Sequence, residues 1–154
     1  MKKIVLVLLM CSLLNGCASL NSLPKSAKDI DFSSRKEGKT GWSRYEEYAT
    51  FESVDLKTVY EAAKVGLADA KFTLKKADYD KGVVMGEHGI TLYDWNVIAG
   101  IYMNEVPNGV EVKVHVEGSK DIGFMGDVTG GNWTGEILKG MRTYISEHRR
   151  RGKI

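Results

Sequence analysis

The sequence predicts an α+β fold in which one antiparallel sheet is packed by two helices, in the order β-α-β-β-β-β-α. Three patterns support this prediction. Valines alternate with polar residues over 110–116, which is the period of a strand with one buried face. Apolar residues recur at steps of three and four over 56–70 and again over 132–149, as in amphipathic helices. Four consecutive strands between two helices favour antiparallel pairing.

The first part of the domain is expected to be a strand followed by a helix. Residues 45–54 alternate in a way that places Ala49 and Phe51 on one face of a strand. Asp55 suits the N-cap of the next helix, because its carboxylate can accept backbone N–H bonds. That helix is predicted over 56–70, with an apolar stripe made of Leu56, Val59, Tyr60, Ala63, Leu67 and Ala70.

Four short strands are expected next, because turn residues separate short β-prone segments. Asp78 to Gly82 is turn-like, and Pro107-Asn108-Gly109 is a strong turn signal. The strands are predicted at 72–74, 83–87, 95–103 and 110–116.

Glycines then indicate a loop over 118–131, with a short extended segment at 122–125. The last element is a helix over 132–149. Its buried stripe is predicted to consist of Trp133, Ile137, Met141 and either Tyr144 or Ile145.

The N-terminus has the order of a bacterial export signal. Two lysines precede the apolar residues 4–14, and Leu14-Asn15-Gly16-Cys17 follows. A helix of this length spans about 16 Å, too little to cross a hydrocarbon core of about 30 Å. The pattern resembles the lipobox of bacterial lipoproteins, Leu-x-Gly-Cys. The resemblance implies removal of residues 1–16 and acylation of Cys17; a secretory signal cut elsewhere is the alternative.

This resemblance divides the chain and predicts its location. Residues 17–43 are expected to form the lipidated N-terminus and a flexible tether, since no apolar period holds there. Residues 44–149 form the predicted single α+β domain, and residues 150–154 a basic C-terminal tail. Ala18 follows the cysteine, where aspartate is the familiar inner-membrane signal. By family analogy we expect an outer-membrane anchor with the domain facing the periplasm.

Charge and cysteine content narrow the classes of function. The chain has 22 Lys and Arg residues and 20 Asp and Glu residues. Positive charge is concentrated over 149–153, so the preceding body is mildly acidic. A nucleic-acid binder needs a basic face, and we therefore expect no nucleic-acid partner. With Cys11 removed in the signal and Cys17 acylated, no intramolecular disulfide is expected.

Several short motifs of the folded part carry a second resemblance. They are Thr58-Val59-Tyr60-Glu61-Ala62-Ala63 leading to Leu67 and Ala70, Lys71-Phe72-Thr73-Leu74, Asp78-Tyr79-Asp80-Lys81-Gly82 and Ile137-Leu138. Over residues 48–145 the chain resembles small envelope lipoprotein domains and the helix-grip repeats of BamC, the accessory lipoprotein of outer-membrane protein assembly. The resemblance implies an α+β fold, and it provides no catalytic residue that could be carried over.

The sequence offers no obvious catalytic or metal-binding set. His115 is expected on the solvated face of its strand. Glu87, His88, His115 and Glu117 would meet only if strands 83–88 and 110–117 were neighbours, and we favour solvated polar side chains instead. No serine lies in a nucleophile elbow, and the mature domain would hold no free thiol. We therefore expect no enzymatic activity, no metal and no cofactor.

Aromatic residues are the first candidates for interaction. Tyr93, Trp95 and Tyr102 surround the start of a predicted strand. Tyrosine and tryptophan often anchor protein interfaces. Core packing is the alternative and is favoured for Trp95 and Trp133.

The basic end allows two interpretations. Arg149, Arg150 and Arg151 can be favourable charges at a helix C-terminus. They can also contact anionic lipid headgroups, at about 1 kcal/mol per charge.

These observations together predict a lipid-anchored envelope lipoprotein that acts as a non-enzymatic interaction or assembly module. Its expected partners are the membrane, through acylated Cys17, and an envelope protein. The alternative is a periplasmic domain that binds a small ligand or lipid in a groove between helix and sheet.

Overall fold

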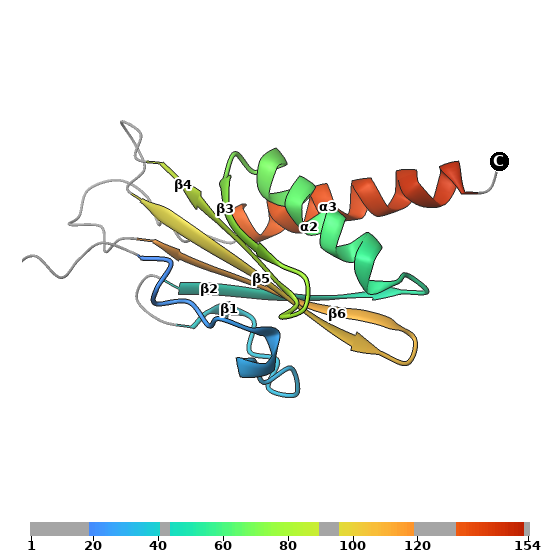
Figure 1. The fold of residues 1–154 in the computed structure, drawn as a ribbon. Coiled ribbons are helices and arrows are strands. Elements are labelled where there is room, and N and C mark those ends of the chain that lie inside the picture. Colours follow the sequence, from blue (N-terminus) through green and yellow to red (C-terminus); the bar gives the residue numbers. More distant parts are fainter. Residues whose placement is uncertain (1–18, 41–43, 90–95, 119–131, 153–154) are drawn as a thin grey trace, which may run out of the picture.

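The computed structural model describes residues 19–40, 44–89, 96–118 and 132–152. In these ranges an antiparallel six-stranded sheet carries two helices on one face and the N-terminal segment on the other (Figure 1). The strand order in the sheet is β1-β2-β6-β5-β4-β3. The elements are η2 (Ala27–Asp29), β1 (Gly38–Lys39), β2 (Arg44–Glu52), α2 (Leu56–Asp69), β3 (Thr73–Asp78), β4 (Val83–His88), β5 (Val97–Val106), β6 (Gly109–Gly118) and α3 (Asn132–Arg151).

The predicted α+β fold and its order of elements are confirmed, with the two-residue strand β1 added in front. β1 pairs with β2, and β2 pairs along its whole length with β6. The predicted turn at 107–108 joins β5 to β6, and Gly109 there has φ 146°, which favours glycine. The loop expected over 118–131, with its extended segment at 122–125, lies outside the described residues except for Gly118.

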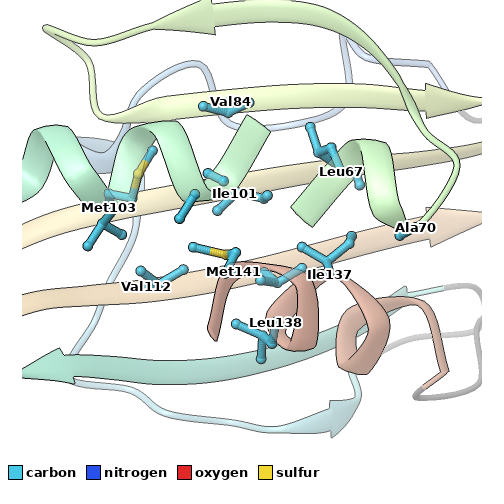
Figure 2. Close-up of a cluster of buried hydrophobic side chains, with 14 of the residues drawn as sticks. Leu67, Ala70, Val84, Ile101, Met103, Val112, Ile137, Leu138 and Met141 are labelled. Carbon is cyan, nitrogen blue, oxygen red and sulfur yellow. The ribbon is translucent and has the colours of Figure 1, made fainter. Parts of the chain in front are cut away.

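The inner face of the sheet forms the main core under α2 and α3. The alternating valines of β6 lie in one buried cluster with the predicted stripe of α2, which confirms the expected pairing of these faces. Figure 2 shows side chains of both helices and three strands meeting there. Leu67, Ile137, Leu138 and Met141 are fully buried between the layers. At these four positions the side chains of the helices pack directly against the sheet.

The two helices approach closely at glycines. A Cβ added at Gly66 would lie 2.5 Å from the backbone oxygen of Ile137, and one at Gly140 would lie 2.9 Å from the Cα of Gly66. Neither position has room for a larger residue unless the helices move apart. The two glycines thus allow α2 and α3 to pack closely against each other.

The outer face of the sheet carries a second apolar cluster. Val83, Met85, Ile98 and Tyr102 are buried there together with Leu23, which is 2% exposed. Leu20, Ala27, Ile30 and Phe32 pack against the same cluster.

Residues 19–40, which we call the strap, therefore lie on the sheet, whereas the sequence analysis expected a flexible tether. The backbone N–H of Ala27 donates to the carbonyl of Lys81 at 2.9 Å, and Ser26 and Asp29 form a capping box around η2. Arg35 forms an ion pair with Glu111 of β6. The physical reason for the difference is the hydrophobic effect. The few large side chains of the strap remove the apolar outer face from water, which stabilises the folded state.

The C-terminal boundary also differs from the expectation. Helix α3 continues to Arg151, so Arg150 and Arg151 belong to the helix and not to a separate tail. No helix in the described part of the chain is both long and apolar enough to cross a bilayer.

Candidate functional sites

Three of the predicted site residues cannot be placed, because Cys17, Tyr93 and Trp95 lie outside the described residues. Trp133 is partly buried and packs against the main core, as expected.

The sequence analysis proposed Tyr102 as a candidate interaction residue, but the structure shows that it is not exposed. It is fully buried in the outer cluster, and its hydroxyl donates to the carbonyl of Pro24 at 3.1 Å. Its ring lies over Gly100, where an added Cβ would meet the hydroxyl at 2.6 Å. Burial raises the pKa of Tyr102, and the charges of Asp29 and Glu46 raise it further. The residue holds the strap to the sheet.

His88 belongs to an aromatic group at one end of the sheet. Its ring lies 4.7 Å from that of Trp133 and 5.6 Å from that of Phe72, measured between centroids. Its Nδ1 is buried without a hydrogen-bond partner in the described part of the chain. His88 cannot meet His115, because β5 lies between β4 and β6. The described ranges contain no group of three or more His, Cys, Asp or Glu side chains that could hold a metal.

A charged cluster lies beneath the strap, on the outer face of β2 and β6. Glu46 accepts from Lys113 Nζ at 2.8 Å and from His115 Nδ1 at 3.0 Å. His115 Nε2 lies 3.8 Å from a carboxylate oxygen of Glu117, which also pairs with Arg44 at 3.4 Å. The side chains of Glu46, Lys113, His115 and Glu117 are only 9–15% exposed.

This cluster corrects the expectation that His115 is solvated. The strand alternation was predicted correctly, but the polar face of β6 is covered by the strap rather than by water. Lys113 also lies over the ring of Tyr48, at 5.4 Å from its centroid. Because the charges are largely removed from water, each depends on its partner.

The ionisation of Glu46 reflects this arrangement. Burial alone would raise its pKa, but hydrogen bonds from His115 and Lys113 outweigh that effect and lower the pKa to about 2. The unfolded chain should titrate near the ordinary value of 4.5. Glu46 therefore contributes stability that is fully present above pH 4.5 and is lost as the pH falls towards 2.

Glu46→Gln should consequently remove an acid-sensitive part of the stability. We expect the free energy of unfolding of the variant to lie below that of the wild type at neutral pH, and the difference to shrink as the pH falls through this window. Urea unfolding at a series of pH values measures both quantities. A difference that stays constant from neutral pH down to about pH 2.5 would contradict the assigned ionisation.

A groove of about 410 Å³ opens above this cluster, between the strap and the sheet. Lys113 and His115 line it together with Tyr48, and acidic and basic side chains are present in balance. In the described part of the chain His115 Nε2 has no hydrogen-bond partner. The groove therefore suits a small neutral or zwitterionic molecule with several hydrogen-bonding groups.

The basic end of α3 forms a second polar surface. Arg149 donates to the backbone carbonyl of Glu52, and Arg151 pairs with Glu147 at 3.2 Å. Arg142 lies two turns before Arg149 on the same side of the helix, and both line a groove of about 380 Å³ against β2. We refer to Arg142, Arg149, Arg150 and Arg151 as the basic end.

No family model and no curated protein matches the chain. Three solved structures that match about two thirds of the chain do so at low similarity. The match with Ara h 8.0201 covers 67% of this chain and 97% of that chain, with a TM-score of 0.48 and 11% sequence identity. The match with MLL2253 from Mesorhizobium loti covers 68% of this chain and 97% of that chain, with a TM-score of 0.49 and 9% sequence identity. The match with TTHA0849 from Thermus thermophilus covers 69% of this chain and 97% of that chain, with a TM-score of 0.41 and 12% sequence identity. At this level of likeness none of them assigns a function to the chain.

Proposed function

We propose that this chain is an envelope lipoprotein, acylated at Cys17, whose domain acts as a non-enzymatic interaction module. The observation that carries the proposal is the sequence Leu14-Asn15-Gly16-Cys17 behind a charged start and a short apolar stretch. Several acyl chains on one cysteine give stable anchoring, whereas a single chain gives only weak and reversible binding. The outer membrane, with the domain facing the periplasm, is the proposed location.

The basic end is the surface we propose for a protein partner. Arg142 and Arg150 are exposed, and within the described residues neither has an ion pair. Exposed arginines at an interface mainly steer association and select partners of opposite charge. The proposed partner surface is therefore acidic.

Cys17→Ser tests the anchor. We expect the variant either to appear in the soluble fraction or to remain as the unprocessed precursor, because the acyl chains have no other attachment point. Fractionation of cells followed by blotting for size and location measures this. Retention of a mature-sized Cys17→Ser protein in the membrane, equal to that of the wild type, would refute the proposal.

Charge reversal tests the partner surface. The double variant Arg142→Glu and Arg150→Glu should reduce recovery of cross-linked partners from intact membranes, and the loss should be greatest at low salt. Lys28→Glu is the matched control, because Lys28 is an exposed cation on the strap, on the opposite face of the sheet. Equal recovery with both variants would exclude the basic end as the binding surface.

The groove under the strap favours a second candidate function, the binding of a small polar molecule. His115 supports it, since this side chain is largely buried, lines the groove, and has no hydrogen-bond partner at Nε2 in the described part of the chain. Lys113 also lines the groove, with its Nζ bound to Glu46. Native mass spectrometry of protein taken gently from membranes should then show an added mass that is lost in Lys113→Met. An unchanged protein mass in every preparation argues for the interaction module alone.

A further inference from the structure

The strap is attached to the sheet almost from its first described residue. Ser22 donates to a carboxylate oxygen of Glu117 at 3.4 Å, and Ser22 also closes a turn onto the carbonyl of Ser19 at 2.8 Å. Leu23 follows directly and is buried in the outer cluster. The described fold therefore includes the strap from Ser19 onward, ahead of the domain start predicted at residue 44.

This early attachment limits the distance between the domain and Cys17. Only Ala18 lies between Cys17 and Ser19, and two residue steps span at most about 7 Å. The tether expected from the sequence, with 26 residues, would have reached about 90 Å when extended. With the strap on the sheet, the domain is held next to the acylated residue.

The attachment point lies at one end of the sheet. Glu117, which holds Ser22, pairs with Arg44 at the beginning of β2. The basic end lies at the other end, because Arg149 donates to Glu52, and Glu52 pairs with Gly109. Glu117 and Gly109 are eight residues apart on β6, which corresponds to about 26 Å. Figure 1 shows the start of the described chain and the end of α3 at opposite ends of the molecule.

We infer that the anchored protein rests on the lipid headgroups with the end of its sheet that carries Ser19, Arg44 and Glu117, and holds the basic end away from the membrane. This inference rests on the proposed acylation of Cys17. A separation of about 26 Å exceeds the Debye length of about 8 Å at physiological ionic strength, so headgroup charge does not act on the arginines. The basic end is then free to meet a partner from the periplasmic side.

The basic end has few unpaired positive charges that could attract it to anionic lipid headgroups. Clusters that bind anionic lipid usually hold about 4–8 basic residues close together. At the basic end Arg149 is engaged with Glu52 and Arg151 with Glu147, and Arg142 lies two turns earlier. The geometry thus favours the upright orientation over one in which α3 lies flat on the bilayer.

Fluorescence quenching by lipid headgroups tests this orientation. Asn21→Cys places a label at the attachment end, whereas Asn108→Cys and Arg150→Cys place labels at the far end; all three positions are exposed. Each acylated variant is purified from membranes, labelled and reconstituted into phosphatidylethanolamine–phosphatidylglycerol vesicles that contain a headgroup-attached quencher. Far-ultraviolet circular dichroism verifies that each variant is folded.

We expect the label at position 21 to be quenched several-fold more strongly than the labels at 108 and 150. Equal quenching at all three positions in vesicle-bound protein would overturn the inference while leaving the anchor intact. Protein that does not associate with vesicles and lacks acyl chains by mass spectrometry would instead overturn the proposed function.

A linker variant separates tight attachment from mere anchoring. Insertion of about 20 Gly and Ser residues between Ala18 and Ser19 adds an average reach of about 25 Å and leaves the fold untouched. Quenching at position 21 should then fall towards the level at 108, while the protein stays on the vesicles. If quenching at position 21 is already low without the insertion, the strap does not hold the domain at the membrane.

Discussion

Val114→Asp is expected to unfold the domain. Val114 is fully buried on the inner face of β6, in the cluster that α2 and α3 cover. A carboxylate at this position would lie among apolar side chains, and burial of an unpaired charge costs several kcal/mol. Single domains are stable by only about 5–15 kcal/mol, so one such change is sufficient to prevent folding. Thermal and urea unfolding followed by circular dichroism measure the loss.

Asn104→Asp provides the matched control. Asn104 is exposed on the neighbouring strand β5, so the same carboxylate remains in water there and should change the free energy of unfolding only slightly. Similar stability of the two variants would mean that the inner face of β6 is assigned wrongly. Lys113, which neighbours Val114 in sequence, is unsuitable as a mild control because its Nζ pairs with Glu46 beneath the strap.

Leu23→Asp is expected to release the strap while the main core stays folded. Leu23 lies among Met85, Ile98 and Tyr102 on the outer face, and an aspartate there would remain unpaired. The strap joins the rest of the molecule through that cluster and a few polar bonds, so its detachment requires less energy than global unfolding. Limited proteolysis should cut the variant within residues 19–40, and circular dichroism should retain the helical signal.

Asn21→Asp is the control for the strap, because Asn21 is exposed two residues before Leu23. We expect its proteolysis pattern to match that of the wild type. Protection of the strap in Leu23→Asp would contradict the packing described for the outer cluster. Complete loss of the helical signal would show instead that strap and core unfold together.

The inner half of the fold could be predicted because its patterns are regular. The alternating valines of β6 and the apolar stripe on α2 each face a single partner layer. The residues that repeat with the period of a strand or a helix are therefore the ones that are buried. The close approach of the two helices could not be predicted in this way, because the contact between Gly66 and Gly140 depends on how α3 crosses α2.

The covering of the outer face by the strap was missed because apolar residues do not recur with a regular spacing in the strap. Leu23 and Ile30 contact the sheet from an irregular segment, and such contacts leave no repeating signal. A usable signal nevertheless existed in β5, where residues 97–103 are all buried. An unbroken apolar run of this kind indicates a strand covered on both faces, and hence a second covering layer.

The charged cluster under the strap was missed for a related reason. Alternation identifies which side chains of β6 share the outer face, but it does not show whether water or protein covers them. His115 was therefore assigned to solvent, and Tyr102 to an exposed surface. The position of the strap explains why the Tyr102 hydroxyl meets Pro24. The low pKa of Glu46 depends on its hydrogen bonds from His115 and Lys113, which alternation alone does not reveal.

The mass of the intact mature protein, purified from membranes, tests the central claim most directly. Acylation at Cys17 predicts a chain that begins at this residue and carries the added mass of a diacylglycerol and a further acyl chain, all located on the N-terminal peptide. An unmodified chain, or one cleaved elsewhere and free of lipid, would contradict both the anchor and the orientation derived from it.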